Sequence, residues 1–272
     1  MVEISVDSGV GLIVMADGDQ GNRLKPSLLK AVTEAVHNHV ADSEVRFILL
    51  RSRGAHFCLG MDLSAFLDNA DKVVFEKEIL GYANMLTALN DSPKTTVAVV
   101  EGTVKAGGVG LAAACDIVIA AENVEFELGE AYLGLFPANV MPYLLTRRIS
   151  PKRAAYLVQS AAVINARDAR DFGLVEEVHP PDKMESAVRK LGRRLVRISP
   201  KATERYKTFV KEILDIPFED RGRRAVDELV KIALEPDVRN GIRAFTEGDL
   251  PEWFDRFKPG SALTGSGEKG KL

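Results

Sequence analysis

The alternation of strand-like and helix-like segments over the first 130 residues most constrains how this chain can fold. Short apolar runs predict strands at residues 45–50, 95–100 and 117–120. Residues 2–17 predict two further strands around Ser8 and Gly9, while segments 26–39 and 73–89 carry apolar residues at helical spacing. This order favours an α/β core built from stacked, right-handed βα units.

The pattern changes after Pro137, where helical spacing dominates apart from a short strand expected at residues 174–178. Consecutive helices are expected from residue 181 to about residue 245. The last residues are rich in Gly, Ser and Lys and lack apolar periodicity, so we expect them to be disordered. The predicted organisation is a core at 1–195, a C-terminal helical region at 196–257 and a disordered tail at 258–272.

Composition excludes several classes of function. The formal net charge of -3 gives no reason to expect nucleic acid as a partner. Two cysteines, Cys58 and Cys115, and four histidines make a disulfide framework or a structural zinc site improbable. No basic-then-apolar leader or membrane-length apolar run is present, so we expect a cytoplasmic protein without a membrane partner.

Two loops of similar design follow neighbouring strand candidates. HFCLGMD comes after the strand ending at Leu50, and VKAGGVG comes after the strand ending at Val100. Both precede helix-like sequence, and active sites of α/β proteins collect at such strand ends. N–H groups at helix starts are unpaired and lie at the positive end of the dipole, so two that converge would bind an oxyanion. The alternative is that the glycines only permit close packing of strand against helix.

Longer segments around these loops resemble the crotonase (enoyl-CoA hydratase/isomerase) superfamily over roughly residues 1–257. The resemblance rests on FCLGMDL, GTVKAGGVGLAAACDIVIA, FELGEAYLGLFP and RAAYLVQSAAVINARDARDFGLVEEV. It implies the crotonase fold, an α/β core of stacked ββα units followed by a C-terminal helical region. It also implies that the backbone N–H groups of Met61 and Gly107 hold a thioester oxygen and stabilise an enolate. No cofactor is expected.

Hydratases of this family use two glutamates, and only one has a counterpart here. The position of the first is Gly110, whereas the second aligns with Glu130 in ELGEAYLG. Flanking Leu128, Leu133 and Phe136 predict an apolar surrounding that raises the pKa of Glu130, which suits a group that takes and returns a proton. The alternative is a surface glutamate favoured by a helix dipole.

The departure at Gly110 points to one group within the superfamily. KAGGVG followed by ELGEAYLGLFPANVMPYLLTRRI resembles the dehydratases of polyketide β-branching cassettes. That resemblance implies loss of water from a 3-hydroxy-3-methylglutaryl chain on an acyl carrier protein, which yields a 3-methylglutaconyl thioester. Glu130 would remove the C2 proton and return it to the departing hydroxyl.

Several other residues are candidates for secondary roles. Tyr82, Tyr132 and Asn139 are possible polar helpers, although packing is the alternative for both tyrosines. The 3-hydroxy-3-methylglutaryl chain ends in a carboxylate that needs a cation as its partner. The choice of this cation stays undecided among Arg147, Arg148, Lys77 and His56. Asp62 is expected to cap the helix that follows it, and Cys58 is not expected to be a nucleophile.

Two other functions remain open. An enoyl-CoA isomerase or hydratase acting on free CoA esters is compatible with one carboxylate, and a catalytically silent acyl-thioester-binding protein is the third reading. The partner is thus an acyl carrier protein bearing a phosphopantetheine thioester, or acyl-CoA.

The basic run from Arg189 to Arg197 is a solvated helix face or a docking surface for the acidic carrier. By resemblance we expect a homotrimer, or two trimers paired into a hexamer.

Overall fold

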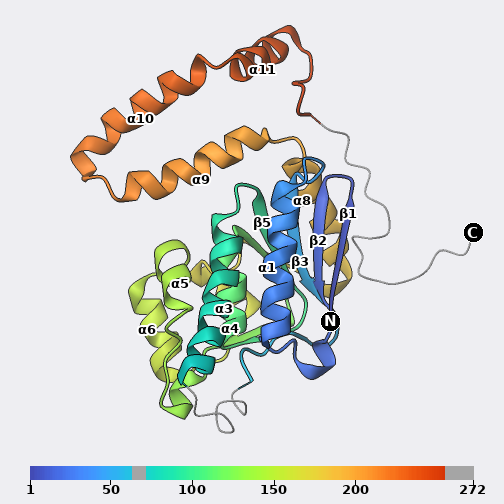
Figure 1. The fold of residues 1–272 in the computed structure, drawn as a ribbon, viewed down its shortest axis with the longest axis vertical. Helices are drawn as coiled ribbons and strands as arrows, with labels where there is room; N and C mark the ends of the chain where they lie inside the picture. Colours follow the sequence, from blue (N-terminus) through green and yellow to red (C-terminus); the bar gives the residue numbers. More distant parts are fainter. Residues whose placement is uncertain (63–71, 255–272) are drawn as a thin grey trace, which may run out of the picture.

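A six-stranded sheet lies at the centre of the computed structural model, which describes residues 1–62 and 72–254 (Figure 1). The sheet order is β1-β2-β3-β5-β7-β10, with β1 and β2 antiparallel and the other neighbours parallel. The strands are β1 Val2–Asp7, β2 Val10–Met15, β3 Phe47–Ser52, β5 Thr95–Val100, β7 Ile117–Ala121 and β10 Glu177–His179. The predicted α/β core is therefore confirmed.

The strands of this sheet form where apolar runs are continuous, because both faces of a parallel sheet are covered. Every residue of β2 is buried, as are five of the six residues of β3 and of β5. Ser8 and Gly9 join β1 to β2 with φ angles of 50° and 83°, the left-handed pair that a tight hairpin turn requires.

A second, four-stranded sheet was not predicted. Its order is β4-β6-β8-β9, and its strands are β4 His56–Cys58, β6 Thr103–Lys105, β8 Glu125–Glu127 and β9 Ile164–Asn165. Strands of two or three residues are too short to show alternation, so two of them were hidden in the predicted loops. Pairing of β4 with β6 brings those two loops together, with His56 opposite Thr103 and Cys58 opposite Val104.

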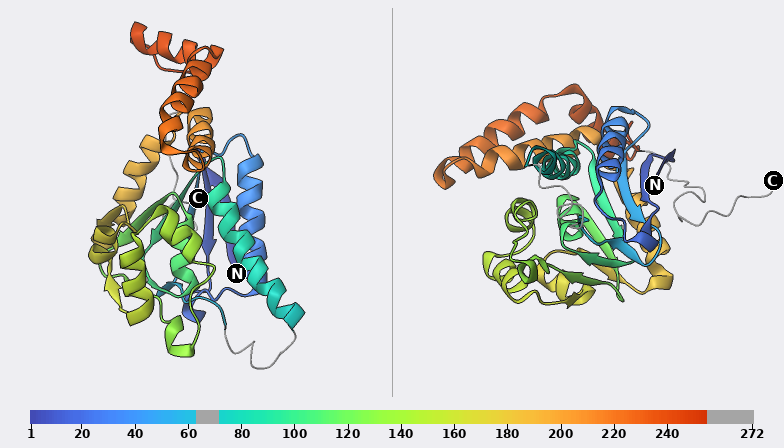
Figure 2. Two further views of the ribbon diagram at one scale, coloured as in Figure 1. Left: turned by 90° about the vertical axis from the view of Figure 1, so that its left-hand side faces the viewer. Right: turned by 60° about the horizontal axis from the view of Figure 1, so that its bottom comes forward.

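Helices cover both faces of the large sheet. Helices α1 and α3 lie side by side on one face, and α8 lies on the other (Figures 1 and 2). All eight residues of α4 are buried, which explains its run of Gly and Ala. The helices of the core are α1 Pro26–Ala41, α3 Lys72–Asp91, α4 Gly107–Ala114, α5 Met141–Arg147, α6 Pro151–Ser160, α7 Ala166–Phe172 and α8 Met184–Leu195.

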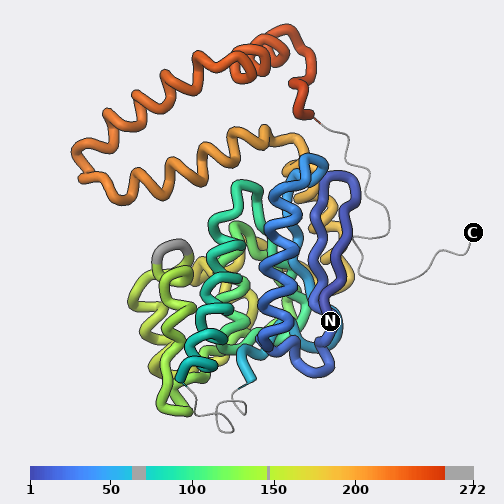
Figure 3. The backbone as a smooth tube through the Cα atoms, viewed as in Figure 1, coloured from blue at the N-terminus to red at the C-terminus, as the bar shows by residue number. Residues whose placement is uncertain are grey.

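Three C-terminal helices form an arm that projects from the core. They are α9 Pro200–Leu214, α10 Phe218–Ala233 and α11 Pro236–Glu247. The backbone tube in Figure 3 enters this arm once, after α8. The Lys207 ammonium on α9 contacts Asp116 Oδ2 at 2.6 Å, and the same oxygen accepts the Thr96 N–H at 2.9 Å. This buried pair anchors the base of the arm to the sheet.

Predicted and observed boundaries agree closely for the long elements. The predicted strand at 95–100 is exact, and the helix predicted at 26–39 runs from Pro26 to Ala41. The strand predicted at 174–178 is instead β10, at Glu177–His179. The predicted tail at 258–272 lies outside the described residues. So does the helix that Asp62 was expected to cap.

Candidate active site

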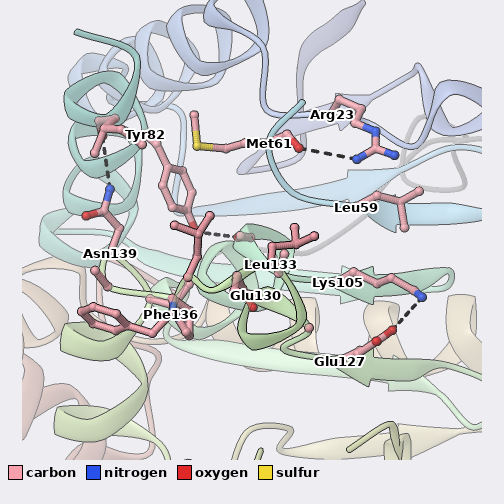
Figure 4. Close-up of a pocket in the computed structure, with 18 of the residues that line it drawn as sticks. Arg23, Leu59, Met61, Tyr82, Lys105, Glu127, Glu130, Leu133, Phe136 and Asn139 are labelled. Atoms are coloured by element: carbon pink, nitrogen blue, oxygen red, sulfur yellow. Dashed lines mark hydrogen bonds and ion pairs between the residues drawn. The ribbon is translucent and has the colours of Figure 1, made fainter. Parts of the chain in front are cut away.

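The two loops singled out in the sequence border one cavity of about 750 Å³ (Figure 4). Met61 comes from the loop after β4, Gly107 begins α4, and Glu130 begins a single 3₁₀ turn, Glu130–Leu133. Helix α3 contributes Tyr82, and the turn before α5 contributes Asn139. The three residues expected to carry catalysis thus lie around one space.

Gly60 lets the first loop approach the second. Its φ of 79° belongs to the left-handed region that favours glycine. A Cβ on Gly60 would lie 2.8 Å from the Ala106 Cβ and 3.1 Å from the Gly107 nitrogen. The Gly60 carbonyl accepts the Leu24 N–H at 3.0 Å, which ties this loop to the start of α1. Met61 therefore follows a backbone turn packed directly against the Gly107 peptide.

The second loop is held by strain on one side and by hydrogen bonds on the other. Ala106 has φ 50° and ψ -123°, a conformation that costs a non-glycine residue about 1–3 kcal/mol. The surrounding structure enforces it, because the Ala106 N–H donates to the Glu127 carbonyl at 2.8 Å and its carbonyl accepts the Val109 N–H at 2.9 Å. This geometry places the Gly107 N–H at the first turn of a buried helix.

The N–H groups of Met61 and Gly107 donate to no acceptor among the described residues. Each belongs to one of the two adjoining loops, and Gly107 also lies at the positive end of the α4 dipole. Unpaired donors in a partly dehydrated cavity are arranged to stabilise a negative oxygen. The geometry is therefore suited to an oxyanion hole, as the resemblance implies.

Glu130 offers the cavity a carboxylate with one oxygen that has no hydrogen-bond partner. Its Oε2 atom is buried and makes no hydrogen bond. Burial raises the pKa of Glu130 above its ordinary value of 4.5, and the nearby Glu127 adds to the effect. The predicted direction of this shift is confirmed. Leu133 and Phe136 line the cavity as expected, and Glu127 pairs with Lys105 at 2.6 Å.

The space near Gly110 is occupied by a phenol. The Tyr82 hydroxyl donates to the Gly107 carbonyl at 2.6 Å, and the side chain is only 3% exposed. Tyr82 lines the cavity, as does Asn139, whose Nδ2 donates to the Ile79 carbonyl at 3.3 Å. The third predicted helper is elsewhere: Tyr132 is 75% exposed and is not among the residues that line the cavity. Its position two residues after Glu130 was a misleading signal, because the 3₁₀ turn directs the two side chains differently.

Three of the four cations considered from sequence, Arg148, Lys77 and His56, have described side chains, and none of these three lines the cavity. Arg148 is structural, since it pairs with Glu176 and donates to the carbonyls of Ala113 and Cys115. The Arg147 side chain lies outside the described part of the chain, and Lys77 is exposed on α3.

The cations that do line the cavity were missed. They are Arg23, Lys72 and Lys105. Lys105 is paired with Glu127, while Arg23 makes one long hydrogen bond, 3.5 Å, to the Met61 carbonyl. Arg23 stands 38 residues before Met61 in the chain, so only the tertiary fold brings it to the cavity.

Cys58 is the last residue of β4, within the first loop, and carries no sign of reactivity. It is fully buried, and burial raises its thiol pKa to about 12. A neutral, inaccessible thiol is a poor nucleophile. Within residues 1–62 and 72–254, no group of three His, Cys, Asp or Glu side chains is arranged to hold a metal ion.

Comparison with known proteins connects this geometry to a family. The family model described as enoyl-CoA hydratase/isomerase matches residues 5–256. A Thermus thermophilus protein assigned as an enoyl-CoA hydratase is 30% identical over 254 residues, which are 92% of this chain and 100% of that protein. Among solved structures, one assigned as an enoyl-CoA hydratase/isomerase (crotonase) from Legionella pneumophila is 29% identical, with a TM-score of 0.86 over 93% of this chain and 98% of that one.

More distant relatives carry more specific names. The trans-2-decenoyl-[acyl-carrier-protein] isomerase of Streptococcus mutans is 26% identical over 92% of this chain and 96% of that protein. The bacillaene synthase dehydratase PksH of Bacillus subtilis is also 26% identical, over 94% of this chain and 97% of that protein. No helix in the described ranges is long and apolar enough to cross a membrane.

Proposed function

Because the chain belongs to the enoyl-CoA hydratase/isomerase (crotonase) family, we propose that it acts on an acyl thioester through an enolate. The specific reaction we propose is dehydration of a 3-hydroxy-3-methylglutaryl thioester on an acyl carrier protein to the 3-methylglutaconyl thioester. The observation that carries this proposal is the Glu130 carboxylate, whose buried Oε2 has no hydrogen-bond partner, in one cavity with two backbone N–H groups that have no acceptor in the described part of the chain. Gly110 supplies no second carboxylate.

In the proposed reaction the Glu130 carboxylate removes the C2 proton, and the electron pair moves into the C1–C2 bond. The thioester oxygen becomes negative and receives the N–H groups of Met61 and Gly107. The enolate then collapses to form the C2–C3 double bond while the C3–O bond breaks. The departing hydroxide takes the proton from Glu130 and leaves as water. One carboxylate thus serves both proton transfers, and its raised pKa suits both taking and returning the proton near neutral pH.

Three further points support the proposed substrate. C–O cleavage at a tertiary centre is easier than at the secondary centre of an ordinary 3-hydroxyacyl thioester, so one carboxylate is sufficient. A relative with near-complete coverage is named as a dehydratase of bacillaene synthase. Arg23 and Lys72 give the cavity positive charge suited to the phosphate of a phosphopantetheine arm, which acyl carrier proteins and CoA share.

Isomerisation of an enoyl thioester is the second candidate. Isomerisation needs one carboxylate to move a proton between two carbons on the same face of the substrate, and Glu130 is such a carboxylate. The isomerase from Streptococcus mutans is a relative of comparable identity. The two reactions share the enolate and differ only in whether C3 carries a leaving group.

Mass spectrometry of intact thioesters detects loss or addition of water, and the ultraviolet absorbance of a conjugated 2-enoyl thioester detects isomerisation, which leaves the mass unchanged; together they separate these candidates. The enzyme is incubated with 3-hydroxy-3-methylglutaryl carrier protein, with crotonyl-CoA and with a 3-enoyl-CoA, and each reaction is repeated with Glu130→Gln. Loss of one water from the carrier-bound substrate alone, abolished in the variant, is the expected result. Turnover of the CoA esters alone would replace the proposal by the isomerase or hydratase function. Binding of thioesters without turnover of any would identify a catalytically silent member.

We also propose that the C-terminal arm assembles the chain into a trimer, or into a hexamer of two trimers. Its helices expose many large apolar side chains, which a solitary arm would leave in water. An apolar groove of about 650 Å³ runs between α9, α10 and α11. The exposed apolar residues are Tyr206, Leu214, Phe218, Val226, Leu229, Val230, Leu234, Ile242, Phe245 and Leu250.

Assembly through the arm predicts that Leu229→Asp dissociates the oligomer. Leu229 is 68% exposed and lines the groove, so a charge there would be buried unpaired in an interface. Sedimentation equilibrium should give three or six times the chain mass of 29.7 kDa for the native protein and a smaller mass for the variant. Arg223→Gln, on the same helix with its side chain 82% exposed, is the control that should not change the mass. A native protein that sediments as a monomer would refute this assembly.

A further inference from the structure

We propose that Tyr82 is the positioning residue of the oxyanion hole and that its hydroxyl occupies the place left open by Gly110. This inference rests on the proposed enolate chemistry and deepens it by assigning a role to a residue outside the aligned motifs. Three observations carry it: a hydrogen bond, a steric relation and the environment of the phenol.

The hydrogen bond acts on the backbone that presents the Gly107 N–H. The Ala106 carbonyl, which shares a peptide plane with that N–H, accepts from Val109 at 2.9 Å. On the other side of Gly107, its own carbonyl accepts the Tyr82 hydroxyl at 2.6 Å. Both peptides that flank the Gly107 Cα are therefore held, and the one on the carboxyl side is held from α3. Without the hydroxyl, the first turn of α4 loses this external restraint on its orientation.

The steric relation couples Tyr82 to Gly110. A Cβ at position 110 would lie 2.3 Å from the Tyr82 hydroxyl oxygen and 2.9 Å from Val140 Cγ2. Real Cβ atoms do not approach other atoms so closely, so any side chain at 110 must displace the phenol. The ring carbon Cζ would lie 3.5 Å from the same Cβ, which is an ordinary contact. The hydroxyl, with the closest approach, and Val140 Cγ2 therefore exclude side chains from position 110, whereas the ring does not.

The environment of the phenol defines what it can do. Burial raises the pKa of Tyr82 well above its ordinary value of 10.0, and the Glu130 carboxylate adds to the effect. The hydroxyl therefore keeps its proton and remains a donor to Gly107, and it does not act as a second base. Glu127 lines the same cavity but is paired with Lys105 at 2.6 Å, so the pairing of Tyr82 with Gly110 leaves Glu130 as the carboxylate available for proton transfer.

The first test is Tyr82→Phe, which keeps the ring and removes the hydroxyl. The rate of C2 proton exchange into D₂O for a bound saturated acyl thioester, such as butyryl-CoA, should fall about three- to tenfold. KM should stay within about twofold, because the ring still lines the cavity. Tyr143→Phe is the matched control: it removes a hydroxyl bonded to Thr87 Oγ1 at 3.0 Å, between α5 and α3, and should not change the exchange rate.

The second test is a double-mutant cycle with position 110. Gly110→Ala should lower both the exchange rate and the melting temperature, because the new methyl group meets the hydroxyl. Tyr82→Phe added to Gly110→Ala should restore part of the melting temperature, so the effects are not additive. Val140→Ala in the Gly110→Ala background measures the other close contact separately.

The outcomes are distinct. Wild-type exchange in Tyr82→Phe, or a double variant with strictly additive losses, would overturn the inference. Rescue of Gly110→Ala by Val140→Ala but not by Tyr82→Phe would also overturn it, since Val140 would then be the obstacle. Proton exchange requires the enolate but no leaving group. An enzyme that exchanges the C2 proton but fails to dehydrate the carrier-bound substrate would therefore refute the proposed reaction and leave the role of Tyr82 intact.

Discussion

Glu130→Gln is expected to lower kcat by about 10²- to 10⁴-fold, the usual contribution of a positioned acid–base group. Glutamine keeps the size of the side chain but cannot take a proton from C2. Oε2 of Glu130 is buried without a partner, and the backbone N–H of Glu130, which bonds to the carboxylate, can also donate to a glutamine oxygen. The loss should therefore appear in turnover and not in folding.

The pH dependence gives this prediction a second readout. Burial raises the pKa of Glu130 above 4.5 in the folded protein. Protonation of Glu130 therefore stabilises the folded state at pH values below its ordinary pKa, and this stabilisation is lost as the pH rises through the folded-state pKa. At neutral pH the variant should thus melt at the same temperature as the native protein or higher. The native kcat/KM should rise with pH through the raised pKa of Glu130, and Glu130→Gln should lack that limb.

A matched control separates charge from chemistry. Glu125→Gln makes the same change on an exposed residue of β8, which shares the four-stranded sheet with β4 and β6. This variant should retain native turnover. Near-native turnover in Glu130→Gln would rule out its role as the acid–base group.

The second large effect is expected for Gly108→Ala, which should abolish activity and destabilise the fold. A Cβ on Gly108 would lie 2.3 Å from the Cys58 carbonyl oxygen and 3.0 Å from the carbonyl carbon. These are backbone atoms of β4, so no side-chain rotation relieves the contact. The strand carrying the first loop must move away from α4, which separates the Met61 and Gly107 donors.

The expected loss in the free energy of unfolding follows from overpacking against the backbone, which costs about 3 kcal/mol. For a chain of this size that corresponds to a fall in Tm of about 6–12 °C in a calorimetric or circular-dichroism melt. The turnover of the surviving folded fraction should fall more than about a hundredfold, the scale of losing one oxyanion donor.

Gly222→Ala is the control for Gly108→Ala. A Cβ at Gly222 meets nothing within 4 Å, and the residue lies inside α10, where alanine is favoured over glycine by about 0.5–1 kcal/mol. The control should melt at or slightly above the native temperature with full activity. Native activity and stability in Gly108→Ala would mean that the two loops do not need their close approach.

Much of the fold was predictable because long elements carry a repeated signal. The helix at Pro26–Ala41 repeats its apolar spacing several times, and the strand at Thr95–Val100 is a continuous apolar run bounded by turn residues, so their type and approximate bounds were recovered from the sequence. Strands β4 and β6 have three residues each, too few to show any period, and they were expected to be loop. Their pairing is nevertheless what brings the two loops together.

The residues of the candidate site likewise fall into those that sequence motifs identified and those that they did not. Met61, Gly107 and Glu130 occupy positions in ordered motifs, and the structure brings all three to one cavity. Tyr132 was inferred only from its nearness to Glu130 in sequence, and it lies outside the cavity. Arg23 was overlooked because nothing local distinguishes it from any other charged residue before a helix.

By itself the sequence determined the α/β class and the order of the main elements, because these depend on local periodicity, which is repeated along the chain. The donor positions Met61 and Gly107 were expected only because motifs in the sequence resemble those of the family. Only the tertiary structure decided that the Tyr82 hydroxyl lies over Gly110 and bonds to Gly107, and that Arg23 reaches Met61. Such contacts join residues 25 or more positions apart, and their geometry depends on how whole elements pack.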